Sequence, residues 1–568
     1  MSLGQIGEPE PSPEESGRAF RRPPRGLLVL LALVPALVLI GVLVVASPWS
    51  GPGSEPEIRG LPEGEVFNAH TLEGAELSVH GSGLGEAAIS LNGEPVEARS
   101  TEDGVVVDVS HLDDGEYTLR VAADATASRT FTVRTTPPAL SLDPIEADAP
   151  GEPVTVTGTA PDAVAIALAD GEGEAGDAEA SADTAPAAPD GPTAATVEPD
   201  EEGGFSLPVD SPGATVRVIA TDAVGNTTTA EVEISVGFPV VRAAHLTASA
   251  WAYDALREPV LDLVREGKLT AVQLDIKDES GEIGYDSQVP LAREIGAVRA
   301  LYDAREAIEE IHEAGGEVVG RIVAFRDPIL ARASWEDGLR DRVVQTPSGE
   351  PYGANTAYGS LSFTNFADPD TRQYHIDLAA EAAELGFDDI LYDYIRRPDG
   401  RLDGQVFPGL GDLTPEESIV AFTADTREVV RTHGARLGVS VYGIAATRPT
   451  EIAQDIPAMA EHVDYIAPMI YPSHWGPGEY GVANPDAQPY DITHRSLADF
   501  AAITEGTGVE IVPWLQDFSM GVRYGPEEVA DQIRAAADND MPSFLLWNAG
   551  ARYQAEALDI AAEALAGD

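Results

Sequence analysis

Cysteine is absent from this sequence of 568 residues, which excludes disulfide bonds, thiolate nucleophiles and metal sites built on cysteine. Lysine is nearly absent as well, because only Lys268 and Lys277 occur among 35 basic residues, against 96 acidic ones. The resulting net charge of -61 repels nucleic acid, so we expect no nucleic-acid partner. This composition suits a salt-rich environment, and a well-solvated surface explains it equally well.

Patterns for metal and nucleotide binding are also missing. His474 has neither a His-x-x-x-His spacing nor a carboxylate cluster beside it, so a loop histidine is the simpler interpretation. No glycine-rich phosphate loop follows any predicted strand. We therefore expect no metal ion and no cofactor.

Charge is missing from one stretch near the N-terminus, residues 26–46, which is long enough to cross a ~30 Å hydrocarbon core as a helix. The residues just before it include a basic group, formed by Arg18, Arg21, Arg22 and Arg25. The positive-inside rule then predicts a cytoplasmic tail at 1–25 and an extracytoplasmic chain from Ser47 onward. We expect a single-pass protein of the cell membrane. The alternative is a signal peptide that is cleaved after Val44-Val45-Ala46.

Two segments with alternating apolar and polar residues follow. In each, a strand pattern (Gly115–Val121, Ala214–Ala220) is followed by a second one, which predicts a hairpin. These hairpins resemble the closing hairpin of bacterial immunoglobulin-like modules, so we predict Ig-like β-sandwiches at 58–136 and 137–237. Neither module carries a tryptophan cluster or a carboxylate pair, which favours a spacer over a carbohydrate-binding role.

Large apolar residues are scarce in two further segments. Residues 47–57 are rich in Pro, Gly and Ser and predict a short linker. Residues 171–203 consist mainly of Ala, Asp, Glu, Gly and Pro, so we predict a disordered insert within the second module.

From residue 240 to residue 568 the pattern changes to alternating strands and helices. Eight apolar strand patterns occur, at 244–250, 271–276, 317–325, 389–395, 436–442, 463–471, 510–515 and 543–547. Eight such alternations in one domain predict a (β/α)8 TIM barrel. A doubly wound sheet would alternate in the same way, but it would normally carry the phosphate loop that is missing here. The predicted fold is thus a transmembrane helix, two β-sandwiches and a barrel.

The fourth of these strands begins with Asp389, and its apolar run is interrupted by one charge, Asp393, near its C-terminal end. A carboxylate in a buried strand costs several kcal/mol unless it is paired or faces a wet cavity, so this position favours chemistry. A helix pattern precedes the strand, with Asp368-Pro369-Asp370 at its start and Gly386 just past its end.

These two sequences, Asp368–Arg372 and Phe387–Arg396, resemble the fourth-strand signature of a family of predicted glycosyl hydrolases with TIM-barrel domains. The resemblance extends over roughly residues 240–560. It implies hydrolysis of glycosidic bonds at the C-terminal ends of the strands. Arg397 departs from the family pattern, which has an aromatic residue there.

Active sites of TIM barrels lie at the C-terminal ends of the strands. We predict that substrate is bound there by Asp275, Lys277, Arg326, Tyr394, Arg396, Tyr471, Trp514, Gln516 and Trp547. Other interpretations remain open. Asp275 and Lys277 are two apart on one strand, so they would point to the same side and could pair with neighbouring charges. Trp514 and Trp547 could be packing residues, and Arg321 could simply balance buried carboxylates.

The catalytic prediction pairs Asp393, as nucleophile or electrostatic stabiliser, with a second carboxyl group. We predict Asp517 as general acid/base, because the indole of Trp514 hinders its ionisation and residues 514–518 resemble the family's seventh-strand motif. Asp278 is the reserve candidate, although Lys277 beside it would lower its pKa. The predicted function is a membrane-anchored extracytoplasmic glycoside hydrolase or transglycosylase acting on a polysaccharide. The alternative is a catalytically silent barrel that binds cell-wall glycan.

Overall fold

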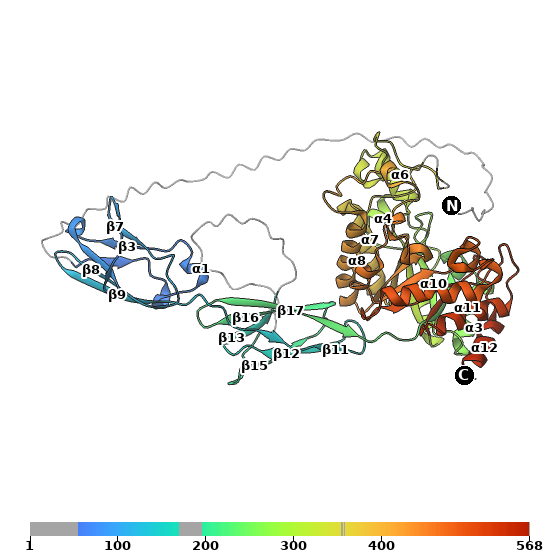
Figure 1. Ribbon diagram of the computed structural model, residues 1–568, viewed down its shortest axis with the longest axis horizontal. Coiled ribbons are helices and arrows are strands. Elements are labelled where there is room, and N and C mark those ends of the chain that lie inside the picture. The colour runs from blue at the N-terminus through green and yellow to red at the C-terminus, as the bar shows by residue number, and fades with distance from the viewer. Residues whose placement is uncertain (1–54, 170–195, 354–355, 357, 567–568) are drawn as a thin grey trace. The chain divides into compact units, whose positions relative to one another are not determined.

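The computed structural model of the chain describes residues 55–169, 196–353, 356 and 358–566 (Figure 1). The predicted membrane segment 26–46 and most of the predicted insert lie outside these ranges. Within them, no helix is both long enough and apolar enough to span a bilayer. By internal contacts the chain divides into two compact units. The boundary between them in the sequence falls between Pro137 and Pro138, and the loop Asp222–Thr227 is grouped with the first unit.

The first unit contains a β-sandwich, in which a four-stranded sheet (β1-β3-β7-β6) and a five-stranded sheet (β2-β9-β8-β4-β5) share one apolar core. Alternation along β8 buries Leu119 and Val121 and leaves Arg120 exposed, as the sequence pattern predicts. The elements are β1 Glu57–Arg59, β2 Val66–Phe67, α1 Ala69–Leu72, β3 Glu76–His80, β4 Ala88–Leu91, β5 Glu94–Pro95, β6 Arg99–Thr101, β7 Gly104–Asp108, β8 Gly115–Ala122 and β9 Thr126–Val133.

The second unit begins with another two-sheet sandwich, of three strands (β10-β12-β15) and five strands (β11-β17-β16-β13-β14). Its strands are β10 Ser141–Leu142, β11 Ile145–Ala147, β12 Val154–Thr159, β13 Ala163–Leu168, β14 Thr196–Val197, β15 Gly204–Val209, β16 Thr215–Asp222 and β17 Thr227–Val236. The predicted disordered insert, 171–203, extends too far at its C-terminal end, because Val197 pairs with Ile166 of β13.

The barrel of the second unit has eight parallel strand positions, and the sheet closes because β18 pairs with both β19 and β26. The predicted TIM-type barrel is therefore confirmed. Its strands are β18 Arg242–Leu246, β19 Ala271–Lys277, β20 Glu317–Val323, β21 Asp389–Asp393, β22 Arg436–Tyr442, β23 Tyr465–Met469, the pair β24 Glu510–Ile511 and β25 Trp514–Gln516, and β26 Phe544–Trp547.

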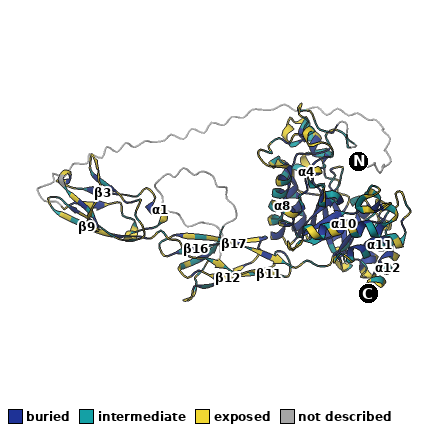
Figure 2. Cartoon of the chain, viewed as in Figure 1, coloured by how far each residue is buried: buried dark blue, intermediate teal, exposed yellow. Residues whose placement is uncertain are grey.

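Helices follow most of the strands and cover the barrel (Figure 1). They are α2 Ala248–Trp251, α3 Asp254–Arg265, α4 Pro290–Glu294, α5 Ala304–Glu313, α6 Pro328–Glu336, α7 Pro369–Leu385, α8 Pro415–Thr432, α9 Ile456–Ala460, α10 Pro489–Ile503, α11 Pro526–Ala537 and α12 Ala555–Ala566. The strands between them are buried on both faces, whereas strands of the two sandwiches alternate between buried and exposed residues (Figure 2).

Strand boundaries in the barrel follow local signals that hydrophobicity does not carry. The first strand ends at Leu246, not at Ala250, because the Thr247 side chain accepts the Ala250 N–H and caps α2. The seventh strand is divided into β24 and β25 around Pro513, which has no N–H for the ladder. The start of α7 agrees with the sequence, since Asp368 accepts the Thr371 N–H at 2.8 Å and Gly386 ends the helix with φ 110°.

Candidate active site at the C-terminal end of the barrel

Asp393 is the last residue of β21 and lies beside Arg321 of the neighbouring strand β20. Its Oδ2 accepts from Arg321 Nε at 3.0 Å and from Nη2 at 2.6 Å, and its Oδ1 accepts the Tyr394 N–H at 2.6 Å. The carboxylate is therefore held at both oxygens, and only 3% of the residue is exposed.

Two further carboxylates contact the same guanidinium. Asp275 Oδ1 accepts from Arg321 Nη1 at 2.9 Å, and Glu279, in the loop after β19, accepts from Nη2. Glu279 and Asp393 thus share one nitrogen, so their facing oxygens are at most about 5 Å apart. The side chain of Glu279 is 37% exposed, whereas Asp275 is buried.

Burial and the nearby Glu279 raise the pKa of Asp275 despite the opposing charges of His245 and Arg321. Burial also acts to raise the pKa of Glu279, but the Arg321 guanidinium outweighs it and lowers that pKa to about 2. One arginine therefore contacts three acids, and the pKa values of two of them, Asp275 and Glu279, are shifted in opposite directions.

Lys277 does not lie with Asp275, contrary to the prediction that both side chains point to the same side. The ladder between β19 and β20 shifts register between these residues, so Asp275 pairs with Arg321 and Lys277 with Ile322. Lys277 is fully buried, where Nζ donates to the Val323 carbonyl and forms an ion pair with Asp327 at 2.9 Å. We assign Lys277 a structural role.

His245 of β18 lies behind Asp275. Its Nε2 is 3.7 Å from Asp275 Oδ2, and its Nδ1 is 2.5 Å from the side-chain oxygen of Gln273. Both His245 and Gln273 are buried. The polar residues of β18 to β21 therefore form one continuous layer at the top of the barrel.

Tyr394 follows Asp393 with φ 50°, a left-handed conformation that is strained for a tyrosine. Its ring lies between two guanidinium groups, with Arg326 and Arg396 each 5.0 Å from the centroid. Arg326 also donates to the Tyr394 hydroxyl at 2.9 Å, and Arg396 donates to the Tyr442 hydroxyl at 2.6 Å. Arg396 is buried, so of these two predicted substrate contacts only Arg326 remains partly exposed.

Arg397 turns into the loop that follows β21. Its Nη1 donates to the carbonyls of Pro398 and Gly400 and to the side chain of Gln405, and its Nη2 reaches the Thr450 carbonyl. Arg397 therefore holds the loop 397–405 together through hydrogen bonds. These bonds explain how the loop accommodates an arginine where the family pattern has an aromatic residue.

Aromatic rings line the mouth after the sixth, seventh and eighth strands. Tyr471 and Phe518 pack on Trp547 with centroid distances of 5.8 and 5.0 Å, and all three are partly exposed. Such a wall suits the C–H face of a sugar ring. Trp514 is different, because it is buried inside the barrel and its Nε1 donates to Ser440 at 2.9 Å, so it is a packing residue.

Gln516 and Asp517 lie where β25 ends. Gln516 is buried, and its side-chain oxygen accepts from the Ser473 hydroxyl at 2.8 Å, which ties the loops after β23 and β25 together. Asp517 Oδ2 accepts the Gln554 N–H at 2.7 Å, just before α12, and its Oδ1 has no partner within the described ranges. Burial raises the pKa of Asp517 to about 7, although the Gln554 bond opposes the shift.

Asp278, the reserve candidate, forms a turn. Its Oδ1 accepts from the Ser280 N–H, the Ser280 hydroxyl and the Glu282 N–H. These local bonds give Asp278 an ordinary turn role. In the part of the chain that the structure describes, no group of three or more His, Asp or Glu side chains is arranged to hold a metal ion.

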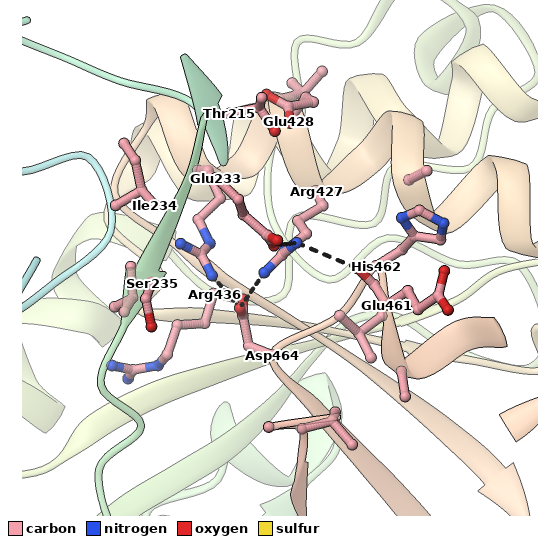
Figure 3. A pocket seen from close by; sticks show the side chains of 18 of the residues that line it. Thr215, Glu233, Ile234, Ser235, Arg427, Glu428, Arg436, Glu461, His462 and Asp464 are labelled. Atoms are coloured by element: carbon pink, nitrogen blue, oxygen red, sulfur yellow. Dashed lines mark hydrogen bonds and ion pairs between the residues drawn. The ribbon is translucent and has the colours of Figure 1, made fainter. Parts of the chain in front are cut away.

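A cleft of the second unit, with a volume of about 1440 Å³, lies at the opposite end of the barrel (Figure 3). Its charged side chains pair with one another: Arg427 Nη1 donates to Glu233 at 2.7 Å, and Asp464 contacts both Arg427 and Arg431. It lies far from the C-terminal ends of the strands, since Arg436 and Glu510 begin β22 and β24.

The structure thus brings Asp393, Asp275 and Arg326 to one region and takes Lys277, Trp514 and Asp278 out of it. Sequence reasoning gave no role to His245 or Glu279. A signal for the inner layer was present, because Gln273 and Asp275 are polar residues two apart in a strand that is otherwise apolar. His245 had no such signal, since it fell inside a strand whose end was placed four residues too late.

Comparison with known proteins identifies the family of the barrel. Residues 243–553 match the family described as "Putative glycosyl hydrolase domain", and no curated protein matches the chain significantly. Among solved structures, a hypothetical protein from Ruminiclostridium thermocellum is 31% identical, over 34% of this chain and 96% of its own, with a TM-score of 0.30.

Two further similar structures are described as glycoside-cleaving proteins. The PgaB (BpsB) glycoside hydrolase domain from Bordetella bronchiseptica is 16% identical over 57% of this chain and 99% of its own, with a TM-score of 0.43. The α-galactosidase TtGalA from Thermus thermophilus is 13% identical over 74% and 91%, with a TM-score of 0.38. Because the family match spans more than half of the sequence, this chain belongs to the family of glycosyl hydrolase domains that it describes.

Proposed function

We propose that the protein is a glycoside hydrolase or transglycosylase that acts on a polysaccharide, with Asp393 as nucleophile or electrostatic stabiliser. The observation that carries the proposal is the position of Asp393 at the C-terminal end of β21, where Arg321 and the Tyr394 N–H bond both oxygens of its carboxylate. Glycosidases of most families use two carboxyl groups about 5–5.5 Å apart for retention, or about 6.5–9.5 Å apart for inversion. An exposed aromatic wall across the mouth adds a surface for a sugar ring.

The reaction needs one ionised and one protonated carboxyl group. Asp393 meets the first requirement, because Arg321 and the Tyr394 N–H hold it as a carboxylate that faces the positive charge developing at the anomeric carbon. The proposed proton donor is Asp517, whose pKa of about 7 leaves it largely protonated below neutral pH. Its proton passes to the glycosidic oxygen as the bond from that oxygen to the anomeric carbon breaks. Water, or an acceptor sugar, then supplies the oxygen that replaces it.

A mechanism-based reagent tests the assignment of Asp393. The full-length protein is incubated with an activated fluoro-sugar and digested, and the labelled peptide is identified by mass spectrometry. We expect the label on the peptide that contains Asp393. Asp399, a carboxylate six residues away whose side chain is 43% exposed, serves as the matched control and stays unlabelled.

Three outcomes of that experiment contradict the proposal. Labelling of Asp399, or of Asp393 in the heat-unfolded protein, would indicate nonspecific alkylation. Binding of oligosaccharides without turnover or labelling would support the alternative of a silent glycan-binding barrel.

We further propose that residues 26–46 anchor the protein in the cell membrane and that the two sandwiches, as Ig-like spacers, carry the barrel outside the cytoplasm. The support comes from the uncharged length of this segment and the basic residues before it. Protease added to cells without their wall should release the ectodomain. A mature protein free in the medium that begins at Ser47 would contradict the anchor.

A further inference from the structure

One half of the Arg321 cluster, Asp275 with His245 behind it, lies at Nη1 of the guanidinium, whereas the partly exposed Glu279 lies at Nη2. Asp275 is 1% exposed and His245 is 4% exposed, whereas the side chain of Glu279 is 37% exposed. Contacts nevertheless run without a break from His245 through Asp275 and Arg321 to Asp393. These four residues come from β18, β19, β20 and β21, which are consecutive strands of the barrel.

The guanidinium of Arg321 is held on two edges. Nε and Nη2 bond to Asp393 Oδ2, at 3.0 and 2.6 Å, while Nη1 bonds to Asp275 Oδ1 at 2.9 Å. Because the group is planar and rigid, a partner at Nη1 fixes the direction in which Nε and Nη2 point. The position of the Asp393 carboxylate therefore depends on Asp275.

His245 packs behind Asp275, with Nε2 3.7 Å from Asp275 Oδ2, an ion-pair distance that is too long for a hydrogen bond. Three contacts keep His245 in place: the bond to Gln273, the edge of the Trp514 ring at a centroid distance of 6.1 Å, and a hydrogen bond from the Tyr553 hydroxyl to the His245 carbonyl. The imidazole is thus fixed at the ring and at the backbone.

We propose that Asp275 and His245 are positioning residues, which fix Arg321 and through it the carboxylate of Asp393. This role replaces the substrate-binding role that the sequence predicted for Asp275. The inference rests on the proposed function for its kinetic consequence, but its geometric consequence is independent of activity.

The test compares Asp275→Leu with the isosteric Asp275→Asn. Leucine removes the acceptor for Arg321 Nη1, so we expect kcat to fall by up to about 100-fold with KM nearly unchanged, as for a misplaced catalytic group. Asparagine retains an acceptor oxygen and should recover most of kcat. The variants His245→Leu and His245→Gln should show the same contrast in kcat, with a smaller loss. They replace the Asp275 pair in the test if Asp275→Leu does not fold.

Asp389→Asn is the matched control, because Asp389 also is a buried barrel aspartate that bonds an arginine, Arg436, but at the other end of the strands. It should lower stability and leave kcat unchanged. A rise in KM at constant kcat for Asp275→Leu would overturn the inference and restore a substrate-binding role. Equal losses in the leucine and asparagine variants would overturn it too.

Crystal structures of the full-length variants separate this inference from the proposed function. In Asp275→Leu the side chains of Arg321 and Asp393 should be reoriented, and in Asp275→Asn they should keep their positions. Unchanged side chains in Asp275→Leu would refute the positioning role, even in an active enzyme. If the wild-type protein cleaves no glycan, the proposed function fails, and the structures still decide the inference.

Discussion

The two ends of the barrel both bury arginine and carboxylate groups, but they balance charge differently. At the C-terminal end, one arginine, Arg321, contacts three carboxylates, and one of them, Glu279, is partly exposed. At the N-terminal end, Arg436 holds Asp389 and Glu317, while Arg427 and Arg431 hold Asp464. The first arrangement has an excess of negative charge, and the second is nearly neutral.

An excess of buried carboxylates is costly, because each charge loses its hydration and the like charges repel. Two features of the C-terminal end show that this cost is offset only in part. Burial raises the pKa of Asp275, and Tyr394 keeps a strained backbone. At the other end the charges are more nearly balanced, so repulsion between like charges is smaller, although burial there also raises the pKa of Asp389, to about 6. The difference indicates that the first end is kept for chemistry and the second for stability, as is general in TIM barrels.

The sharpest way to break this comparison is Asp393→Asn. Loss of the negative charge should lower kcat on the order of 10⁴-fold, because the carboxylate acts on the transition state. Stability should stay equal or rise, since repulsion among the three acids is relieved. Polysaccharide turnover and thermal unfolding measure the two effects. Unfolding of this variant at room temperature would make Asp393 a structural partner of Arg321 instead.

Asp464→Asn is the counterpart at the other end. Its carboxylate contacts Arg431 and Arg427 and accepts the Leu437 N–H at 2.7 Å, so the substitution leaves the buried guanidinium of Arg431 without its acid. Breaking such a pair costs about 3–5 kcal/mol of unfolding free energy. Chemical denaturation should show this loss, while kcat of the folded fraction stays unchanged. A large loss of kcat with normal stability would contradict the division of roles.

The sequence predicted the strands at both ends of the barrel better than the contacts between their side chains. The alternation of short apolar runs with helix patterns was enough to predict the eight strands. A charge within the apolar run of the fourth strand was enough to identify Asp393 as a candidate. The register shift after Asp275 was not predictable, because a bulge leaves the hydrophobic pattern of β19 intact while it turns Lys277 to the helices. Partners such as Arg321 with Glu279, or Asp517 with Gln554, join residues that are distant in the sequence and depend on loop geometry.

The smallest expected effect is the pH dependence that Asp517 contributes. It tests whether one of the acids at the C-terminal end is a proton donor. Its pKa in the folded protein is about 7, above the ordinary value near 4, because burial disfavours the charged form. The bound proton therefore stabilises the fold fully below about pH 4, and this contribution is lost as pH rises through 7. If Asp517 is the donor, kcat/KM of the wild-type enzyme also falls above about pH 7.

Asp517→Asn should remove the contribution of this residue to the pH dependence of stability and the decline of kcat/KM above about pH 7. The variant stays neutral at every pH, so its unfolding free energy at pH 8 should exceed that of the wild type, and the difference should vanish near pH 4. Its activity should be low and should lack the decline near pH 7, since no proton is left to lose. Denaturation curves at pH 4, 6 and 8, with pH profiles of kcat/KM, check both statements. An unchanged decline near pH 7 in this variant would show that another group donates the proton, and the buried Asp517 would then be only a partner for the chain that enters α12.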